Sequence, residues 1–159
     1  RGSFKCGLRF NQKRSFGSIN FQMSRGFGGS ARIVWQDENT VVYEYAPFNL
    51  NEPEYRNSEH VYDGRITISK DSMVEPEIHE KLKVMHSGKK KLIIKRIRRD
   101  VDFDALLDAG KITIENSRYC WHLVGTEKNI GMIAMKIVFR IYDHYQDEGT
   151  LPETVSLHY

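Results

Sequence analysis

The residues best suited to do chemistry in this chain are the basic ones in the segment KKKLIIKRIRR, which runs from Lys89 to Arg99. Seven of its eleven residues are Lys or Arg, and the other four are Leu or Ile. This composition predicts a β-strand with one buried face and one cationic face. Cationic side chains attract anionic partners such as phosphate groups or acidic proteins. The candidate binding residues of this basic strand are Lys89, Lys90, Lys91, Lys95, Arg96, Arg98 and Arg99.

Three roles fit the basic strand. Lysine-rich strands protect sheet edges against aggregation, and basic side chains also pair with acidic parts of the same chain. A second role is contact with the phosphates of a nucleic acid. Against it, the strand has no aromatic side chain for base stacking, and the pI of about 8.8 is below the level above about 9 typical of such domains. The third role is a docking face for a protein partner.

The glycine-rich segment from Gly26 to Ala31 formally matches the dinucleotide-binding pattern G-x-G-x-x-A. That pattern needs a helix directly after it, because the helix N-terminus holds the pyrophosphate. Residues 32–35 predict a strand instead, so we expect a hairpin turn over Gly26–Gly29. Aromatic side chains at such a tip anchor protein partners. The candidate anchors, from this tip and from a predicted loop over residues 47–63, are Phe27, Phe48 and Tyr55.

No motif in the sequence indicates a metal site, a cofactor or a catalytic centre. His79-Glu80 begins like the zinc motif H-E-x-x-H, but position 83 is Lys. His79 and His86 would lie about 10 Å apart along a helix axis, too far to share one ion. The chain has no nucleophile elbow, P-loop or calcium loop. We expect no cofactor, and an enzyme whose active site is assembled from distant residues is the second alternative to a binding protein.

Composition sets the broad class. A chain of 159 residues with 40% hydrophobic and 28% charged residues fits one globular domain. No apolar run approaches the roughly 18–20 residues that span a bilayer, so we expect no membrane partner and a cytoplasmic location. Cys6 and Cys120 form no C-x-x-C pair, and we expect both to be reduced thiols, with a single bridge between them as the alternative for a secreted protein.

Charge is unevenly distributed along the chain, although the net charge is only +3. The first 32 residues carry seven basic residues and no acidic one. From Asp100 to Tyr159 there are ten acidic residues against five basic ones. This asymmetry predicts separate basic and acidic regions, which either attract one another in the fold or form a docking surface.

The first half of the chain predicts mostly strands. Residues 1–17 show no period and form a basic N-terminal arm. Alternating apolar residues then predict strands from Ser18, over Ala31–Trp35 and over Thr40–Tyr45, which together form an antiparallel meander. After the 47–63 loop, Arg65–Ser69 predicts a further short strand.

The second half predicts two helices that flank the basic strand and two further strands. Apolar residues at helical spacing predict a helix over residues 72–86, with Pro76 in its first turn and Gly88 after its end. A short helix over Asp102–Ala109 is closed by Gly110. The further strands are predicted at Lys111–Glu115 and Arg118–Val124.

The longest predicted helix follows, from about Ile130 to Tyr145, where apolar residues recur at intervals of three and four. Gly149 and Pro152 mark its end. Three further residues make its apolar face wider than one stripe, which predicts burial against the sheet and against either the shorter helix or a second copy of the chain. These three residues are Met132, Met135 and Phe139.

The elements do not alternate as βαβ units, so the sequence predicts an α+β fold. We expect a mainly antiparallel sheet of about six strands, with the long C-terminal helix packed on one face and one shorter helix. Residues 18–159 form a single domain after the arm. We expect a small non-enzymatic binding protein, of the inhibitor, immunity-type or accessory-subunit kind, that recognises a protein partner through the hairpin tip, the 47–63 loop and the basic strand. A nucleic-acid-binding module that uses Lys89–Arg99 is the first alternative.

Overall fold

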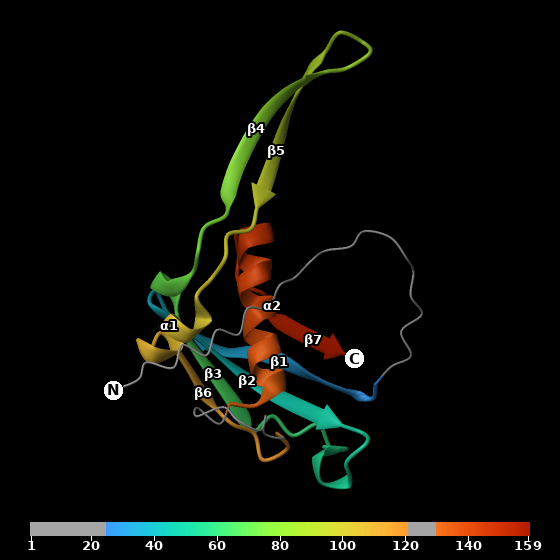
Figure 1. Cartoon of the computed structure of the whole chain (residues 1–159), viewed down its shortest axis with the longest axis vertical. Helices are drawn as coiled ribbons and strands as arrows, with labels where there is room; N and C mark the ends of the chain where they lie inside the picture. Colours follow the sequence, from blue (N-terminus) through green and yellow to red (C-terminus); the bar gives the residue numbers. More distant parts are fainter. Residues whose placement is uncertain (1–24, 121–129) are drawn as a thin grey trace, which may run out of the picture.

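A computed structural model describes residues 25–120 and 130–159 of the chain. The predicted basic arm, the predicted strand from Ser18 and residues 121–124 of the predicted strand Arg118–Val124 lie outside the described residues. The fold is α+β, as the sequence predicts, with a five-stranded antiparallel sheet, a separate two-stranded hairpin, one long helix and one short one (Figure 1). No helix of the described residues has the length and apolar character needed to cross a bilayer.

The main sheet is built from strands whose alternate residues are buried. In β2, Val41, Tyr43 and Tyr45 are at most 1% exposed and point to the core, while the residues between them are half-buried. Every neighbouring pair of strands is antiparallel, and the spatial order is β6-β3-β2-β1-β7. The bounds are Phe27–Gln36 for β1, Thr40–Asn49 for β2, Gly64–Ser69 for β3, Ile112–Glu115 for β6 and Thr154–His158 for β7.

Helix α2, Met132–Glu148, packs its apolar stripe across one face of this sheet, as predicted (Figure 1). It ends at Gly149, whose φ of 78° is the left-handed conformation that glycine adopts readily at a helix C-terminus. The short helix α1, Phe103–Asp108, lies beside it and is capped by Asp102. The buried residues of α2 are Ile133, Ala134, Ile137, Val138, Ile141, Tyr142 and Gln146.

The wide apolar face of α2 is partly covered by α1, whereas the helix predicted over residues 72–86 does not form and covers none of it. The ring of Phe103 lies 4.7 Å from that of Phe139 and 5.1 Å from that of Tyr142, measured between centroids. Met132 is half-buried against the core, and Met135 is half-buried as well. Contacts within one chain thus account for much of this face.

The predicted hairpin turn at Gly26–Gly29 is wrong. Phe27, Gly28 and Gly29 lie inside β1, paired with β2 on one side and with β7 on the other. A Cβ atom on Gly28 would lie 2.0 Å from the carbonyl oxygen of Leu157, and one on Gly29 would lie 2.7 Å from Ile133 Cγ2. These glycines therefore permit close packing in a central strand and do not form a flexible tip.

The predicted helix over residues 72–86 is also wrong. A short 3-10 turn, η2, covers Lys70–Ser72, and strand β4 follows over Glu77–Val84. Ile78 and Leu82, four residues apart, share one face in a strand as well as in a helix, so their spacing did not distinguish the two. β4 pairs with β5, Lys90–Ile97, which confirms the predicted basic strand, but its predicted buried face is wrong because all eight residues of β5 are exposed.

Other differences are smaller. Strand β2 continues to Asn49, and the segment after it contains a 3-10 turn, η1, over Pro53–Tyr55, so the predicted 47–63 loop is shorter and partly ordered. Arg118 and Tyr119 form a turn where a strand was predicted. The edge strand β7, which follows Pro152, was not predicted from the sequence.

Candidate functional site

The β4–β5 hairpin, residues 77–97, projects from the body of the protein beyond the C-terminal end of α2 (Figure 1). We refer to it as the ribbon. All eight residues of each of its strands are exposed, and among residues 25–120 and 130–159 its strands pair only with each other. Gly88, with a φ of 77°, lies in the turn at its tip. An isolated two-stranded hairpin is only marginally stable in water, so the presence of this exposed ribbon requires a structural or functional explanation.

The base of the ribbon is fixed to α2 by polar contacts. Arg96 Nε donates to the backbone oxygen of Gln146 at 2.9 Å. The Gln146 side chain, only 2% exposed, accepts from Arg99 N at 2.6 Å and donates to Arg99 O at 3.0 Å. Arg98 pairs with Asp143 at 2.7 Å and with Asp147. Three candidate binding residues therefore hold the ribbon on the body.

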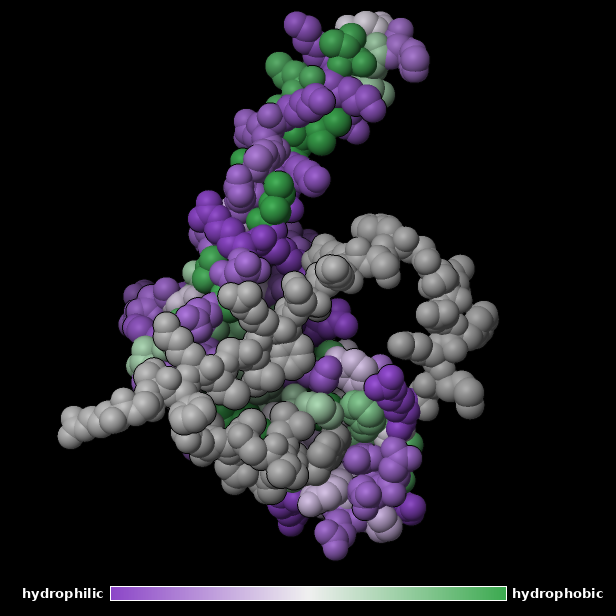
Figure 2. Space-filling view, in the orientation of Figure 1, coloured by the Kyte–Doolittle hydropathy of each residue, from purple (hydrophilic) through white to green (hydrophobic). Residues whose placement is uncertain are grey.

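The first face of the ribbon is largely apolar. Residues directly opposite each other in the ladder share a face, and on this face Leu82 stands opposite Leu92. Figure 2 shows hydrophobic residues among hydrophilic ones along the projecting hairpin. The apolar side chains of this face are Ile78, Leu82, Val84, Leu92 and Ile94, with exposed fractions of 54%, 62%, 63%, 50% and 58%. We call these five residues the apolar face.

The second face carries four lysines, Lys81, Lys83, Lys91 and Lys95, which we call the lysine face. Lys83 stands directly opposite Lys91, an arrangement of like charges that destabilises a sheet. No carboxylate of residues 25–120 or 130–159 pairs with any of the four. The nearest acidic neighbour on this face, Glu77, is bonded to His79 at 2.6 Å.

Charge is separated between the ribbon and the body. The ribbon carries seven Lys or Arg and two Glu, a net charge of +5. The rest of the described chain, residues 25–76, 98–120 and 130–159, carries eleven Lys or Arg and eighteen Asp or Glu, a net charge of −7. The ribbon and the rest of the described chain thus form a basic and an acidic region, whereas most of the predicted basic N-terminal region lies outside the described residues.

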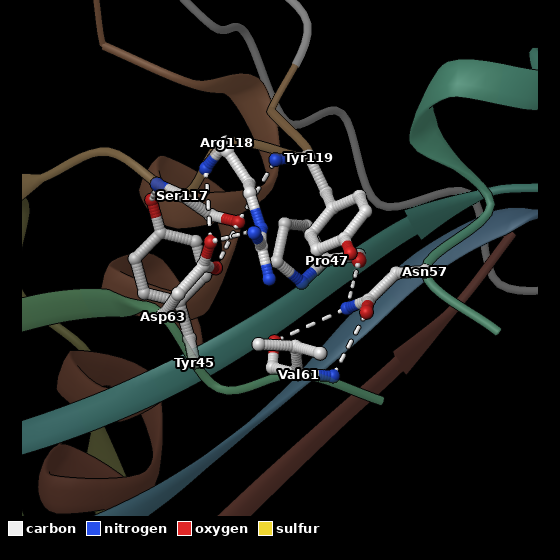
Figure 3. Close-up of polar contacts among 8 residues, drawn as sticks. All are labelled: Tyr45, Pro47, Asn57, Val61, Asp63, Ser117, Arg118 and Tyr119. Atoms are coloured by element: carbon white, nitrogen blue, oxygen red, sulfur yellow. Dashed lines mark hydrogen bonds and ion pairs between the residues drawn. The ribbon is translucent and has the colours of Figure 1, made fainter. Parts of the chain in front are cut away.

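A second polar cluster lies at the turn after β6 and is shown in Figure 3. The carboxylate of Asp63 accepts from Ser117 Oγ and from Arg118 N, and pairs with Arg118 Nε at 3.3 Å. Ser117 N donates to Tyr45 Oη at 3.1 Å. Tyr119 N donates to Ser117 Oγ at 3.1 Å. The Ser117 hydroxyl is the group of this cluster that an enzyme could use as a nucleophile, but here its hydrogen bonds stabilise the turn.

The titratable groups next to Asp63 have raised pKa values, which makes them less reactive. Burial, with a smaller effect of the Asp63 carboxylate, raises the pKa of the Cys120 thiol. Burial also raises the pKa of Tyr45 far above its usual value. Both groups therefore stay protonated at neutral pH, and a protonated thiol is a poor nucleophile. The cluster ties the turn after β6 to β2 and β3, which is a structural role.

The segment between β2 and β3 is held by a similar local network (Figure 3). Asn57, only 4% exposed and with a φ of 45°, donates to Pro47 O at 3.0 Å and accepts from Val61 N at 2.8 Å. These bonds fix the course of the chain through residues 57–61. The segment is therefore an ordered connection at the end of the sheet.

The predicted aromatic anchors lie far from the basic residues. Phe27 is half-buried and its ring stacks on Tyr159 at 5.3 Å. Phe48 is half-buried with its ring 6.1 Å from that of His158. Tyr55 is half-buried in η1. The end of β2 and η1 are at the opposite end of the molecule from the ribbon, so the structure does not unite the predicted sites (Figure 1).

Two further features were considered as sites. Within residues 25–120 and 130–159, no three His, Cys, Asp or Glu side chains lie close enough together to hold a metal ion. An open hollow of about 430 Å³ lies between the end of β1, η2 and the end of α2, lined by Ile33, Lys70 and Tyr145 among others. Lys70 there bonds Gln36 at 3.3 Å and Tyr145 bonds Glu75, so both polar groups already have partners.

Comparison of the chain with family models, with curated proteins and with solved structures finds no match. The residues that sequence reasoning missed are those of the apolar face in β4, Ile78, Leu82 and Val84. The signal that could have found them is the short Ser87-Gly88 connection between two runs of alternating residues, which is typical of a hairpin.

Proposed function

We propose that this chain is a non-enzymatic binding protein that engages a protein partner through the apolar face of the ribbon. The observation that carries the proposal is the apolar face itself. Five large aliphatic side chains, each at least 50% exposed, lie together on one side of a projecting hairpin. Contiguous exposed apolar surface on a soluble protein marks interaction sites, whereas scattered apolar residues do not.

The free energy gained by burying the apolar face indicates that a partner must also contact other parts of the protein. Full burial of a Val, Leu or Ile side chain contributes about 1.5–3 kcal/mol. Because these five side chains are already about half covered, completing their burial contributes on the order of 5 kcal/mol in total. Association costs about 4–15 kcal/mol in lost freedom. The apolar face therefore supplies anchors for binding, and further contacts must bring the complex to a useful affinity.

Pre-organisation favours this role. The contacts of Arg96, Arg98 and Arg99 with α2 fix the direction in which the ribbon leaves the body. A ribbon that is already oriented loses less conformational freedom on binding than a free hairpin. The net charge of +5 on the ribbon steers it toward acidic surfaces, and the aliphatic side chains then dock.

Site-specific photo-crosslinking in cells tests the proposal. A photoreactive phenylalanine analogue is placed at position 82 on the apolar face, at position 81 on the lysine face or at the exposed position 54 on the body. We expect a discrete protein adduct from position 82 and not from position 54. The double substitution Leu92→Ser/Ile94→Ser should abolish this adduct while the far-UV circular dichroism spectrum, which reports the secondary structure, stays unchanged. The same adducts from all three positions, or none from position 82, would refute the proposal.

A further inference from the structure

In the proposed function the lysine face contributes only to electrostatic steering, and it makes no contact with the docked partner. We propose that it binds double-stranded DNA without sequence specificity, through contacts between its four lysines and phosphate groups, with the ribbon lying in the major groove. The proposal goes beyond protein binding because it concerns the opposite side of the ribbon. The two faces can therefore be tested separately.

The first support is the unpaired charge. Lys83 and Lys91 face each other across the ladder; toward the base on the same face, Lys81 lies one step beyond Lys83 and Lys95 lies two steps beyond Lys91. Such an arrangement is unfavourable in the free protein because like charges repel across a ladder. A polyanion converts the same arrangement into a favourable one, since each ammonium can then release a counterion from a phosphate.

The second support is shape. Side chains two residues apart on one face of a strand are about 6.7 Å apart, and the two strands are about 4.8 Å apart. The lysine face thus spans about 13 Å from the level of Lys83 to that of Lys95. The major groove of B-DNA, about 12 Å wide, admits a two-stranded ribbon. Flexible lysine side chains on both strands would reach the phosphates on either side.

The third support is the separation of charge. Among the described residues, those outside the ribbon carry a net charge of −7, whereas the ribbon carries +5 and projects away from them (Figure 1). Within this part of the chain, DNA is therefore attracted to the ribbon; residues 1–24, which the structure does not describe, carry five further Lys or Arg. Approach along the ribbon axis avoids the acidic end of α2, where Asp147 and Glu148 lie.

The composition of the ribbon selects among nucleic acids. No Phe, Tyr or Trp occurs in residues 77–97, so the ribbon lacks the large aromatic rings on which single-strand binders stack bases. The major groove of A-form RNA is deep and narrow and does not admit protein elements. At mid-face, Ile93, 39% exposed, suits contact with a thymine methyl group. The expected order of affinity is DNA duplex first, then single strand and RNA duplex.

Fluorescence anisotropy with the full chain tests this order. The probes are a labelled mixed-sequence DNA duplex of about 20 base pairs, its single strand, and the RNA duplex of the same sequence. Four phosphate contacts predict a slope of about −3.6 in log affinity against log salt, which is about a 150-fold loss between 50 and 200 mM salt. Lys83→Gln/Lys91→Gln should lower the slope to about −1.8, a loss of about 12-fold over the same range.

Two controls make the result specific. Arg56→Gln/Arg140→Gln removes the same charge from exposed positions on the body and should leave the slope unchanged. Leu82→Ser/Leu92→Ser alters only the apolar face and should leave DNA affinity within about twofold of wild type, so failure of protein binding and failure of DNA binding are distinguishable. Three outcomes would overturn the inference: no duplex binding at 50 mM salt, an equal loss in the body variant, or polyglutamate, single strands or RNA bound as tightly as duplex DNA.

Discussion

Replacement of Gln146 by Ala should release the ribbon from the body at a measurable loss of stability. The Gln146 side chain is 2% exposed and makes two hydrogen bonds with the backbone of Arg99, at 2.6 and 3.0 Å. Each such bond contributes about 1 kcal/mol net, and the buried part of the side chain lost on truncation adds about 0.8 kcal/mol per methylene. The expected decrease in the free energy of unfolding is therefore about 2–3 kcal/mol.

Two measurements separate a local from a global effect. Urea denaturation gives the free energy of unfolding, and hydrogen exchange reports the opening of the ribbon and of residues 98–100. We expect exchange in that region to accelerate more than exchange in β2. Gln36→Ala is the matched control, because Gln36 is exposed and makes only a 3.3 Å bond to Lys70 Nζ. It should change stability by less than about 0.5 kcal/mol. Equal effects of the two substitutions would refute the anchoring role of Gln146.

Three further predictions follow from the same structure. Replacing both carboxylate partners of Arg98, Asp143→Asn/Asp147→Asn, should lower stability by only about 0.5–1 kcal/mol in urea, because these groups are 31–40% exposed; a loss above about 2 kcal/mol would contradict this. Gly28→Ala should lower the free energy of unfolding by more than about 2 kcal/mol in thermal denaturation, because its Cβ would meet the Leu157 carbonyl at 2.0 Å; retention of wild-type stability would show that β7 moves freely. Burial raises the pKa of the Cys120 thiol above its ordinary value of 9.0, so the stability that this thiol contributes is fully present below pH 9.0 and is lost as the pH rises above that value. Cys120→Ala should therefore flatten the decrease in the free energy of unfolding between about pH 8 and 11. An unchanged slope would contradict a raised pKa.

The sequence predicted correctly those elements whose apolar residues recur at a spacing that fits only a helix or only a strand. The helix α2 and the strand β3 have buried residues at spacings that fit only a helix or only a strand. The basic strand was predicted from its composition, in which β-branched Ile93, Ile94 and Ile97 lie among basic residues. In these segments local pattern and tertiary packing agree, so the fold class followed from them.

The prediction failed where tertiary contacts decide. Gly28 and Gly29 resemble a turn in sequence, but the space they leave is filled by Leu157 and Ile133, more than 100 residues away. Ile78 and Leu82 fit either period, and only pairing with β5 makes the segment a strand. Contacts of that range are not encoded in a local window.

Only the basic part of the candidate site was predicted, because its apolar part and its ion pairs depend on tertiary contacts. The basic residues of Lys89–Arg99 were identified from composition, but composition does not show which of them are neutralised. Arg98 pairs with residues of α2 almost 50 positions later, whereas Lys91 and Lys95 have no such partner among the described residues. The apolar face was missed entirely because half of it comes from a strand that was assigned to a helix.

The ribbon combines three properties that are individually unfavourable in an isolated protein: exposed aliphatic side chains, opposed lysines and a two-stranded sheet with no covering layer. Protection of a sheet edge explains lysines but not an apolar face of five residues on the same hairpin. Crosslinking from the apolar face and salt-dependent binding at the lysine face are therefore complementary tests. If only the first succeeds, the lysines serve to steer the ribbon to an acidic protein; if both succeed, the ribbon joins DNA on one side to a protein on the other.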